Sequence, residues 1–114
     1  MKFRSISITL ATCLSMGASV AFADSHGMMK LAEEKQCLGC HLTSEELPRA
    51  PSFQSIAQKY TEDDREMLVE VVKTGGEDHW GSAVMPPTEE RAEVSDQEAN
   101  DLVDWILNLR DEGM

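Results

Sequence analysis

Residues 37–41, with the sequence CLGCH, constrain the fold and chemistry of this chain more than any other stretch. Two residues between the cysteines let the backbone coil through one helical turn, which brings both thiols to the edge of one flat ring. Each thiol can then add across a vinyl group of a haem, while the histidine lies under the iron. The segment therefore predicts one covalent haem c, attached through Cys37 and Cys40, with His41 as an iron ligand.

A Cys-x-x-Cys pair also occurs in zinc sites and in redox disulfides. A zinc site needs a second pair of ligands, and the remaining cysteine, Cys13, lies in an apolar run near the N-terminus. A thioredoxin-like disulfide stands in a βαβ context, which this sequence does not predict. Haem attachment is the favoured interpretation.

Residues 1–23 have the pattern of a cleaved signal peptide. A short basic start precedes a mostly apolar run at 6–20, and a small-x-small cleavage site ends at Ala23. The run contains Ser, Thr and Gly and is shorter than the ~20 strongly apolar residues of a membrane span. We expect a mature chain that begins at Asp24, a periplasmic location and no stable membrane insertion.

Residues 24–114 are enough for one small domain. The sequence has 10 Lys and Arg residues against 21 Asp and Glu residues, a formal net charge of −11, and the leader contributes no acid. This acidity argues against nucleic acid or an anionic membrane as a partner. It suits partner proteins with basic patches, and it also serves solubility alone. We expect a monomer, with a dimer left open.

Strand signals are scarce, and apolar residues recur at helical spacing. Two capping patterns, Thr61 with Asp64 and Ser95 with Glu98, mark helix starts. The expected helices are 26–36, 52–60, a third after Thr61 that ends at Gly75-Gly76, and a last one after Ser95. Residues 42–51 and 77–94 are expected to be loops. The prediction is an all-α domain of about four short helices.

A haem iron bound by one histidine has a sixth position that a second side chain can fill. The candidates are the other histidines and methionines of the mature chain: His26, His79, Met28, Met29, Met67, Met85 and Met114. Met85 is favoured because it lies in a loop before two prolines, which restrict the backbone around the thioether. His79 is the main rival, Met67 falls on a helical apolar stripe, and a loop methionine can also simply fill a gap.

Together these motifs resemble those of the small bacterial class I cytochromes c, which are short periplasmic electron carriers. The resemblance covers residues 27–110. It is carried by the CLGCH segment, by Ala50-Pro51 with Phe53, by HWG at 79–81 leading to MPP at 85–87, and by Trp105. The family often has glycine where Ala50 stands. Its members best suited to basic partners carry a ring of lysines around the haem edge, whereas this chain has few lysines, so partner identity stays open.

The resemblance implies a class I cytochrome c fold around one haem, with His41 and Met85 as axial ligands. It implies that the Pro51 carbonyl accepts a hydrogen bond from Nδ1 of His41, which orients the ring. It also places Trp80 near a haem propionate and makes the first and last helices cross, with Leu31 at the crossing. For Trp105 we expect packing alone.

The function that the resemblance implies is one-electron transfer rather than enzymatic catalysis. The iron would cycle between Fe(III) and Fe(II), with a membrane cytochrome complex as donor and a terminal oxidase or reductase as acceptor. Two alternatives stay open: the electron-accepting haem subunit of a dehydrogenase or sulfur-oxidising complex, and a ligand-binding or peroxidase-like haem protein with an open sixth position.

Overall fold

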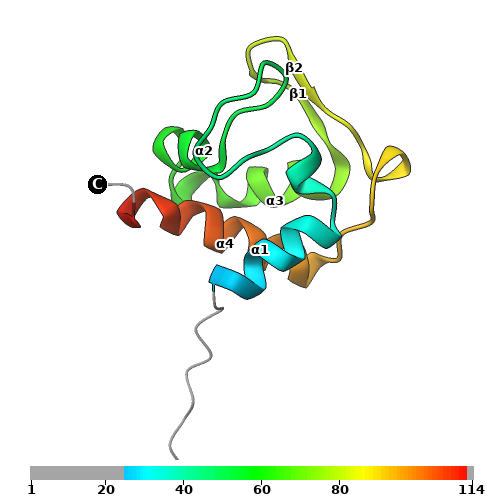
Figure 1. The fold of residues 1–114 in the computed structure, drawn as a ribbon. Helices are drawn as coiled ribbons and strands as arrows, with labels where there is room; N and C mark the ends of the chain where they lie inside the picture. The colour runs from blue at the N-terminus through cyan, green and yellow to red at the C-terminus, as the bar shows by residue number, and fades with distance from the viewer. Residues whose placement is uncertain (1–24, 113–114) are drawn as a thin grey trace, which may run out of the picture.

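The computed structural model describes residues 25–112, so the expected signal peptide and Met114 lie outside the described residues. Four α-helices form the frame, as expected: α1 (Ser25–Glu34), α2 (Phe53–Lys59), α3 (Arg65–Thr74) and α4 (Asp96–Glu112). Three short 3-10 helices lie at Cys37–Gly39, Glu62–Asp64 and Thr88–Glu90. A hairpin of β1 (Gly76–Trp80) and β2 (Ala83–Met85) stands above α3 (Figure 1). Within residues 25–112, no helix is both long and apolar enough to cross a membrane.

The core is built on one face of α4, which contacts α1, α2 and α3. The apolar stripe expected from the sequence is buried, as is the tryptophan beside it: Ala99, Leu102, Val103, Trp105, Ile106 and Leu109. Met28 and Ala32 of α1 and Phe53 and Ala57 of α2 complete this cluster, and Leu31 packs against it. The crossing of the first and last helices is therefore present (Figure 1). Burial of each such large side chain stabilises the fold by about 1.5–3 kcal/mol.

Both expected capping boxes are confirmed. The Thr61 N–H donates to the Asp64 carboxylate at 2.9 Å, and Thr61 opens the 3-10 turn that leads into α3. The Ser95 N–H donates to Glu98 at 2.8 Å, and the Glu98 N–H donates back to the Ser95 hydroxyl at 3.2 Å. These side chains satisfy helix-end amides that have no partner within the helix. The boundaries of α3 and α4 are thus local properties of the sequence.

The expectation that all of 77–94 is loop was wrong, because the β1–β2 hairpin occupies its first part. Trp80 pairs with Ala83 across a turn in which Gly81 adopts a φ of +58°. Asp78 has a φ of +65° where the ladder register shifts, which is the geometry of a bulge. The strand β1 has the sequence GEDHW, which lacks the alternating β-branched pattern of an ordinary strand. Its pairing depends on tertiary contacts.

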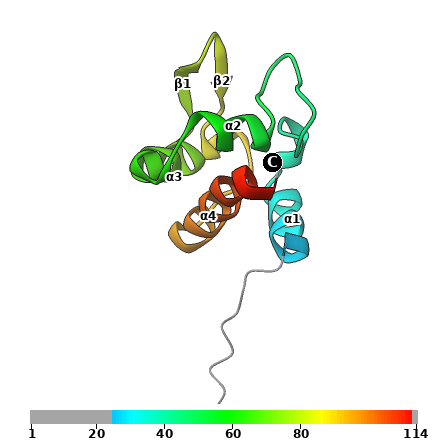
Figure 2. The same cartoon turned by 90° about the vertical axis from the view of Figure 1, so that its left-hand side faces the viewer.

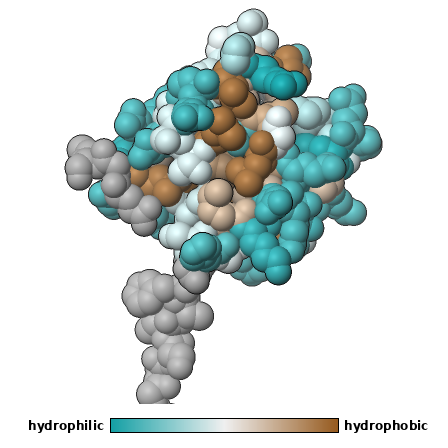
Figure 3. Space-filling view, viewed as in Figure 1, coloured by the Kyte–Doolittle hydropathy of each residue, from teal (hydrophilic) through white to brown (hydrophobic). Residues whose placement is uncertain are grey.

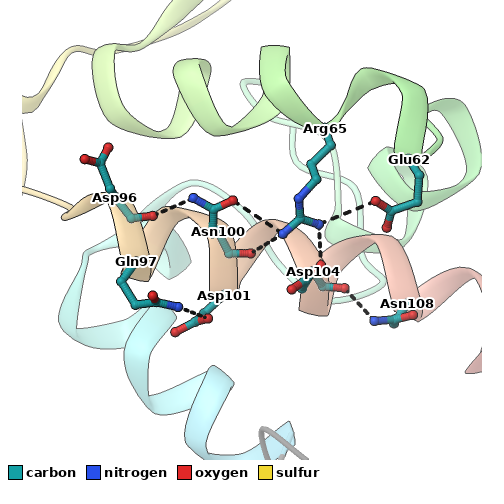
Figure 4. Close-up of polar contacts among 8 residues, drawn as sticks. All are labelled: Glu62, Arg65, Asp96, Gln97, Asn100, Asp101, Asp104 and Asn108. Atoms are coloured by element: carbon teal, nitrogen blue, oxygen red, sulfur yellow. Dashed lines mark hydrogen bonds and ion pairs between the residues drawn. The ribbon is translucent and has the colours of Figure 1, made fainter.

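A polar network on the surface joins α3 to α4 (Figure 4). The Arg65 guanidinium donates to the Asp104 carboxylate and to the backbone carbonyl of Asn100, and pairs with Glu62 at 3.5 Å. Exposed ion pairs contribute little individually, about 0–1 kcal/mol. The network therefore orients α3 on α4 more than it stabilises the fold.

Candidate haem site

An open cavity with mostly apolar walls lies between the hairpin, the helices α2, α3 and α4, and the segment 37–53. Figure 2 shows the hairpin and the loop that precedes α2 on opposite sides of the molecule. We call the side formed by Cys37, Cys40, His41 and Pro51 the attachment wall. The side formed by α3, the hairpin and Pro86 is called the Met85 wall. Apolar residues gather in the middle of the face that Figure 3 shows.

The attachment wall has the local geometry that the spacing predicts. Residues Cys37–Gly39 form a single 3-10 turn, and the His41 N–H donates to the Cys37 carbonyl at 2.8 Å. Both cysteines are half-buried and line the cavity, and neither forms a disulfide with a described residue. Within residues 25–112, no group of three or more His, Cys, Asp or Glu side chains gathers as a metal site would require. The turn therefore presents two thiols to one flat apolar partner.

His41 is held in a defined orientation and protonation state. Its Nδ1 lies 2.7 Å from the Pro51 carbonyl oxygen, so Nδ1 carries the proton and donates it to that bond. Burial lowers the pKa of His41, against the Pro51 bond that raises it, and the charge of Arg91 lowers it further. The ring stacks on Phe53 at 5.3 Å between centroids, and Phe53 meets Trp105 edge-on. A neutral ring with Nδ1 protonated leaves the Nε2 lone pair available to a metal.

The helix α3 shows what kind of group the cavity accepts. Its apolar stripe, Met67, Leu68, Val71 and Val72, lines the cavity, yet none of its residues is fully buried. An amphipathic helix in a folded domain places its apolar stripe against a core. Here that stripe faces the cavity, so a large apolar body is needed to complete the core. A flat, apolar macrocycle fits these walls, with Cys37 and Cys40 at its edge and His41 at its metal.

Met85 lies on the wall opposite His41, in a segment that packs closely against the end of α3. Gly75 ends that helix with φ +82° and ψ −179°. A Cβ added to Gly75 would stand 2.5 Å from the Met85 carbonyl oxygen and 2.9 Å from backbone atoms of Pro86 and Pro87. Only glycine permits both this backbone conformation and this approach. The backbone of Met85 therefore rests directly on Gly75.

The structure shows which of the other candidate residues lie close enough to the cavity to be the sixth iron ligand. Met28 is buried in the helical core, Met29 accepts a hydrogen bond from Thr43, and His26 is exposed on α1. None of these three lines the cavity, whereas Met67 and His79 do. The expectation that Met67 is ordinary core is therefore incomplete, because its side chain is only half-buried and faces the same space as Met85.

Trp80 lines the cavity beside the hairpin turn and is held from outside by α2. The Lys59 ammonium lies 4.6 Å from the Trp80 ring centroid and donates to the His79 carbonyl at 2.7 Å. The Tyr60 hydroxyl donates to the same carbonyl at 3.1 Å. These contacts connect β1 to the end of α2, and they explain how a segment with low strand propensity is held in the hairpin.

Three positioning features were not found by sequence reasoning. Gly75 predicts the end of a helix. Its close contact with the Met85 backbone is a tertiary contact, and no local sequence pattern predicts it. Neither Lys59 nor Arg91 belongs to a recognised sequence motif. Arg91 donates from Nε to the Pro86 carbonyl at 2.7 Å and from Nη2 to the Val72 carbonyl. Only the folded chain brings these partners together.

The fold and the site define a small helical protein that carries one covalent haem. The family model for cytochrome c matches residues 29–110. Cytochrome c-552 of Hydrogenobacter thermophilus is 34% identical over 96 residues, which are 82% of this chain and 88% of that protein.

Solved structures agree in fold. The crystal structure of wild-type Nitrosomonas europaea cytochrome c552 has a TM-score of 0.63 at 34% identity and covers 72% of this chain and 99% of that one. A class 1 cytochrome from Sideroxydans lithotrophicus ES-1 gives a TM-score of 0.58 at 26% identity, with 75% and 96% covered.

The chain belongs to the cytochrome c family, among its small class I members. The class I fold is therefore confirmed, as is one haem c bound covalently through Cys37 and Cys40. Cytochromes c are electron-transfer proteins rather than enzymes, and they exchange electrons with redox partner proteins.

Proposed function

We propose that this cytochrome is a periplasmic one-electron carrier in which His41 and Met85 bind the iron on opposite faces of the haem. Its donor is a membrane cytochrome complex, and its acceptor is a terminal oxidase or reductase. The observation that carries the proposal is the arrangement of the cavity. A neutral, oriented imidazole stands on one wall, and a thioether on a rigidly seated backbone stands on the other.

The bound haem supplies a one-electron Fe(III)/Fe(II) couple. The Pro51 carbonyl fixes the His41 ring and strengthens it as a donor, as second-shell partners do. The Met85 thioether is neutral and the cavity walls are apolar, so both favour the reduced iron and a positive potential. Held by both His41 and Met85, the iron would have no position left for a substrate, and the chain would need little rearrangement on reduction.

Trp80 is proposed to meet a haem propionate through its indole N–H. Its place on the cavity wall and the Lys59 ammonium over its ring support this role. A cation at this position lowers the cost of holding a carboxylate beside an apolar cavity.

The partner surface is proposed to surround the mouth of the cavity. Val84 lines the cavity, and its side chain is 61% exposed. Glu77 and Asp78 on the neighbouring strand are exposed as well. An apolar spot beside acids suits brief contact with a partner whose matching surface is basic, with charge guiding the encounter. The strong acidity of the whole chain supports the same choice.

Replacement of Met85 by Ala tests the ligand assignment, with Met67→Ala as the matched control. Met85→Ala should abolish the thioether-to-iron charge-transfer band of the oxidised protein, open the iron to cyanide, and lower the potential. Met67→Ala should cost stability through a cavity, about 2–5 kcal/mol, and leave the band in place. If the two variants exchange these outcomes, Met67 is the ligand. If neither variant alters the band, the methionine assignment is wrong.

Export is tested by the intact mass of the protein recovered from a periplasmic fraction. We expect the mass of residues 24–114 plus one haem. A mass that retains residues 1–23 would contradict cleavage after Ala23.

A further inference from the structure

We propose that Arg91 is a positioning residue for the sixth iron ligand: its guanidinium fastens the backbone next to Met85 to the end of α3. This inference rests on the proposed ligation by Met85 and adds a residue that no motif of the chain marks.

The first support is the pair of bonds that Arg91 makes. Nε donates to the Pro86 carbonyl at 2.7 Å, one residue after Met85, and Nη2 donates to the Val72 carbonyl in the last turn of α3. Pro86 and Pro87 have no N–H, so this stretch cannot hold itself by ordinary backbone pairing. The planar fork of a guanidinium suits two carbonyls better than a single ammonium does.

The second support is that Arg91 stands on a segment that is itself anchored. The N–H of Ala92 donates to the Gln36 side chain at 2.8 Å, and Lys35 donates to the Glu93 carbonyl at 3.1 Å. Lys35 and Gln36 immediately precede Cys37. Residues 91–93 are therefore fixed to the attachment wall, and the Arg91 side chain extends from there to the Met85 wall.

The test is cyanide binding to the oxidised holoprotein. Cyanide forms an Fe–C bond as the Fe–S bond to Met85 breaks, and no electron is gained or lost. Arg91→Gln should raise the cyanide affinity by about tenfold or more, because hydrogen bonds to a charged group no longer restrain the thioether. Arg91→Lys keeps the charge but not the forked guanidinium, and it should also raise the cyanide affinity. This variant replaces Arg91→Gln in the test if the Gln variant does not accumulate as holoprotein.

Arg110→Gln is the matched control. Arg110 also donates to backbone carbonyls, those of Ala57 at 2.7 Å and Gln58 at 2.9 Å, but it braces α4 against α2. Its loss should weaken the fold and change the cyanide affinity by less than about twofold. An equal rise in the Arg110 variant would show general loosening and overturn the inference, as would an unchanged affinity in Arg91→Lys.

A double variant separates this inference from the proposed function. Where Met85→Ala raises the cyanide affinity, adding Arg91→Gln should raise it no further, because the ligand being positioned is gone. If Met85→Ala has no effect, the ligand assignment fails. If Met85→Ala has its effect and Arg91→Gln has none, the ligand assignment stands and the role of Arg91 is wrong.

Discussion

Gly75→Ala should disturb the haem site although residue 75 bears no ligand. The backbone at Gly75, with φ +82° and ψ −179°, lies in a region that is essentially restricted to glycine and costs other residues about 1–3 kcal/mol. The new methyl group would also stand 2.5 Å from the Met85 carbonyl oxygen. Because its neighbours there are backbone atoms, the strand end must move, and we expect a total loss of about 2–4 kcal/mol.

Urea unfolding of the oxidised holoprotein measures the lost stability, and the thioether-to-iron band in the same samples reports on Met85. Gly81→Ala is the matched control: Gly81 has φ +58°, and its added Cβ meets no atom within 4 Å. The control should cost about 1–2 kcal/mol for the backbone and leave the band unchanged. Equal losses in the two variants, with the band intact in both, would refute the close seating of Met85 on Gly75.

Three further predictions concern the frame around the site. Glu98→Gln should lower the urea midpoint at neutral pH, and by less and less as the solution is acidified, because the Ser95 N–H and then Lys35 hold the pKa of the Glu98 carboxyl below its ordinary value. That stabilisation is present above the ordinary pKa and is lost as pH falls through the depressed one. Trp105→Phe should cost about 1 kcal/mol, against about 3–5 for Trp105→Ala, because phenylalanine keeps most of the buried aromatic ring that alanine removes; equal costs would contradict this. Lys59→Met should speed hydrogen exchange of the β1–β2 amides more than Tyr60→Phe does, since it removes the cation over Trp80 as well as a bond to His79; equal rates would count against that contact.

The features that sequence reasoning recovered are those with a local cause. Helical spacing and the two capping boxes are determined within a few residues, so α4 begins where expected, whereas Thr61 caps a 3-10 turn and α3 begins only at Arg65. The turn at residues 37–39 follows from the spacing of the cysteines. The hydrogen bond from His41 to Pro51 spans ten residues, and the family resemblance implied it.

The features that were missed depend on contacts between distant segments. The strand β1 has poor strand propensity and is held by Lys59, the last residue of α2, and by Tyr60, which follows it. The bonds of Arg91 and the seat at Gly75 exist only after α3 and the Met85 segment meet. The sequence also could not separate Met67 from Met85 by their position on the cavity, because that requires the direction in which α3 faces.

Redox titration of the purified holoprotein, followed by its optical spectrum, shows which ligands hold the haem iron. A haem held between His41 and Met85 should give one reversible one-electron transition at a positive potential, with low-spin iron in both states and the thioether-to-iron band present only in the oxidised protein. A high-spin spectrum, or an oxidised protein that lacks this band, would contradict a haem held between His41 and Met85.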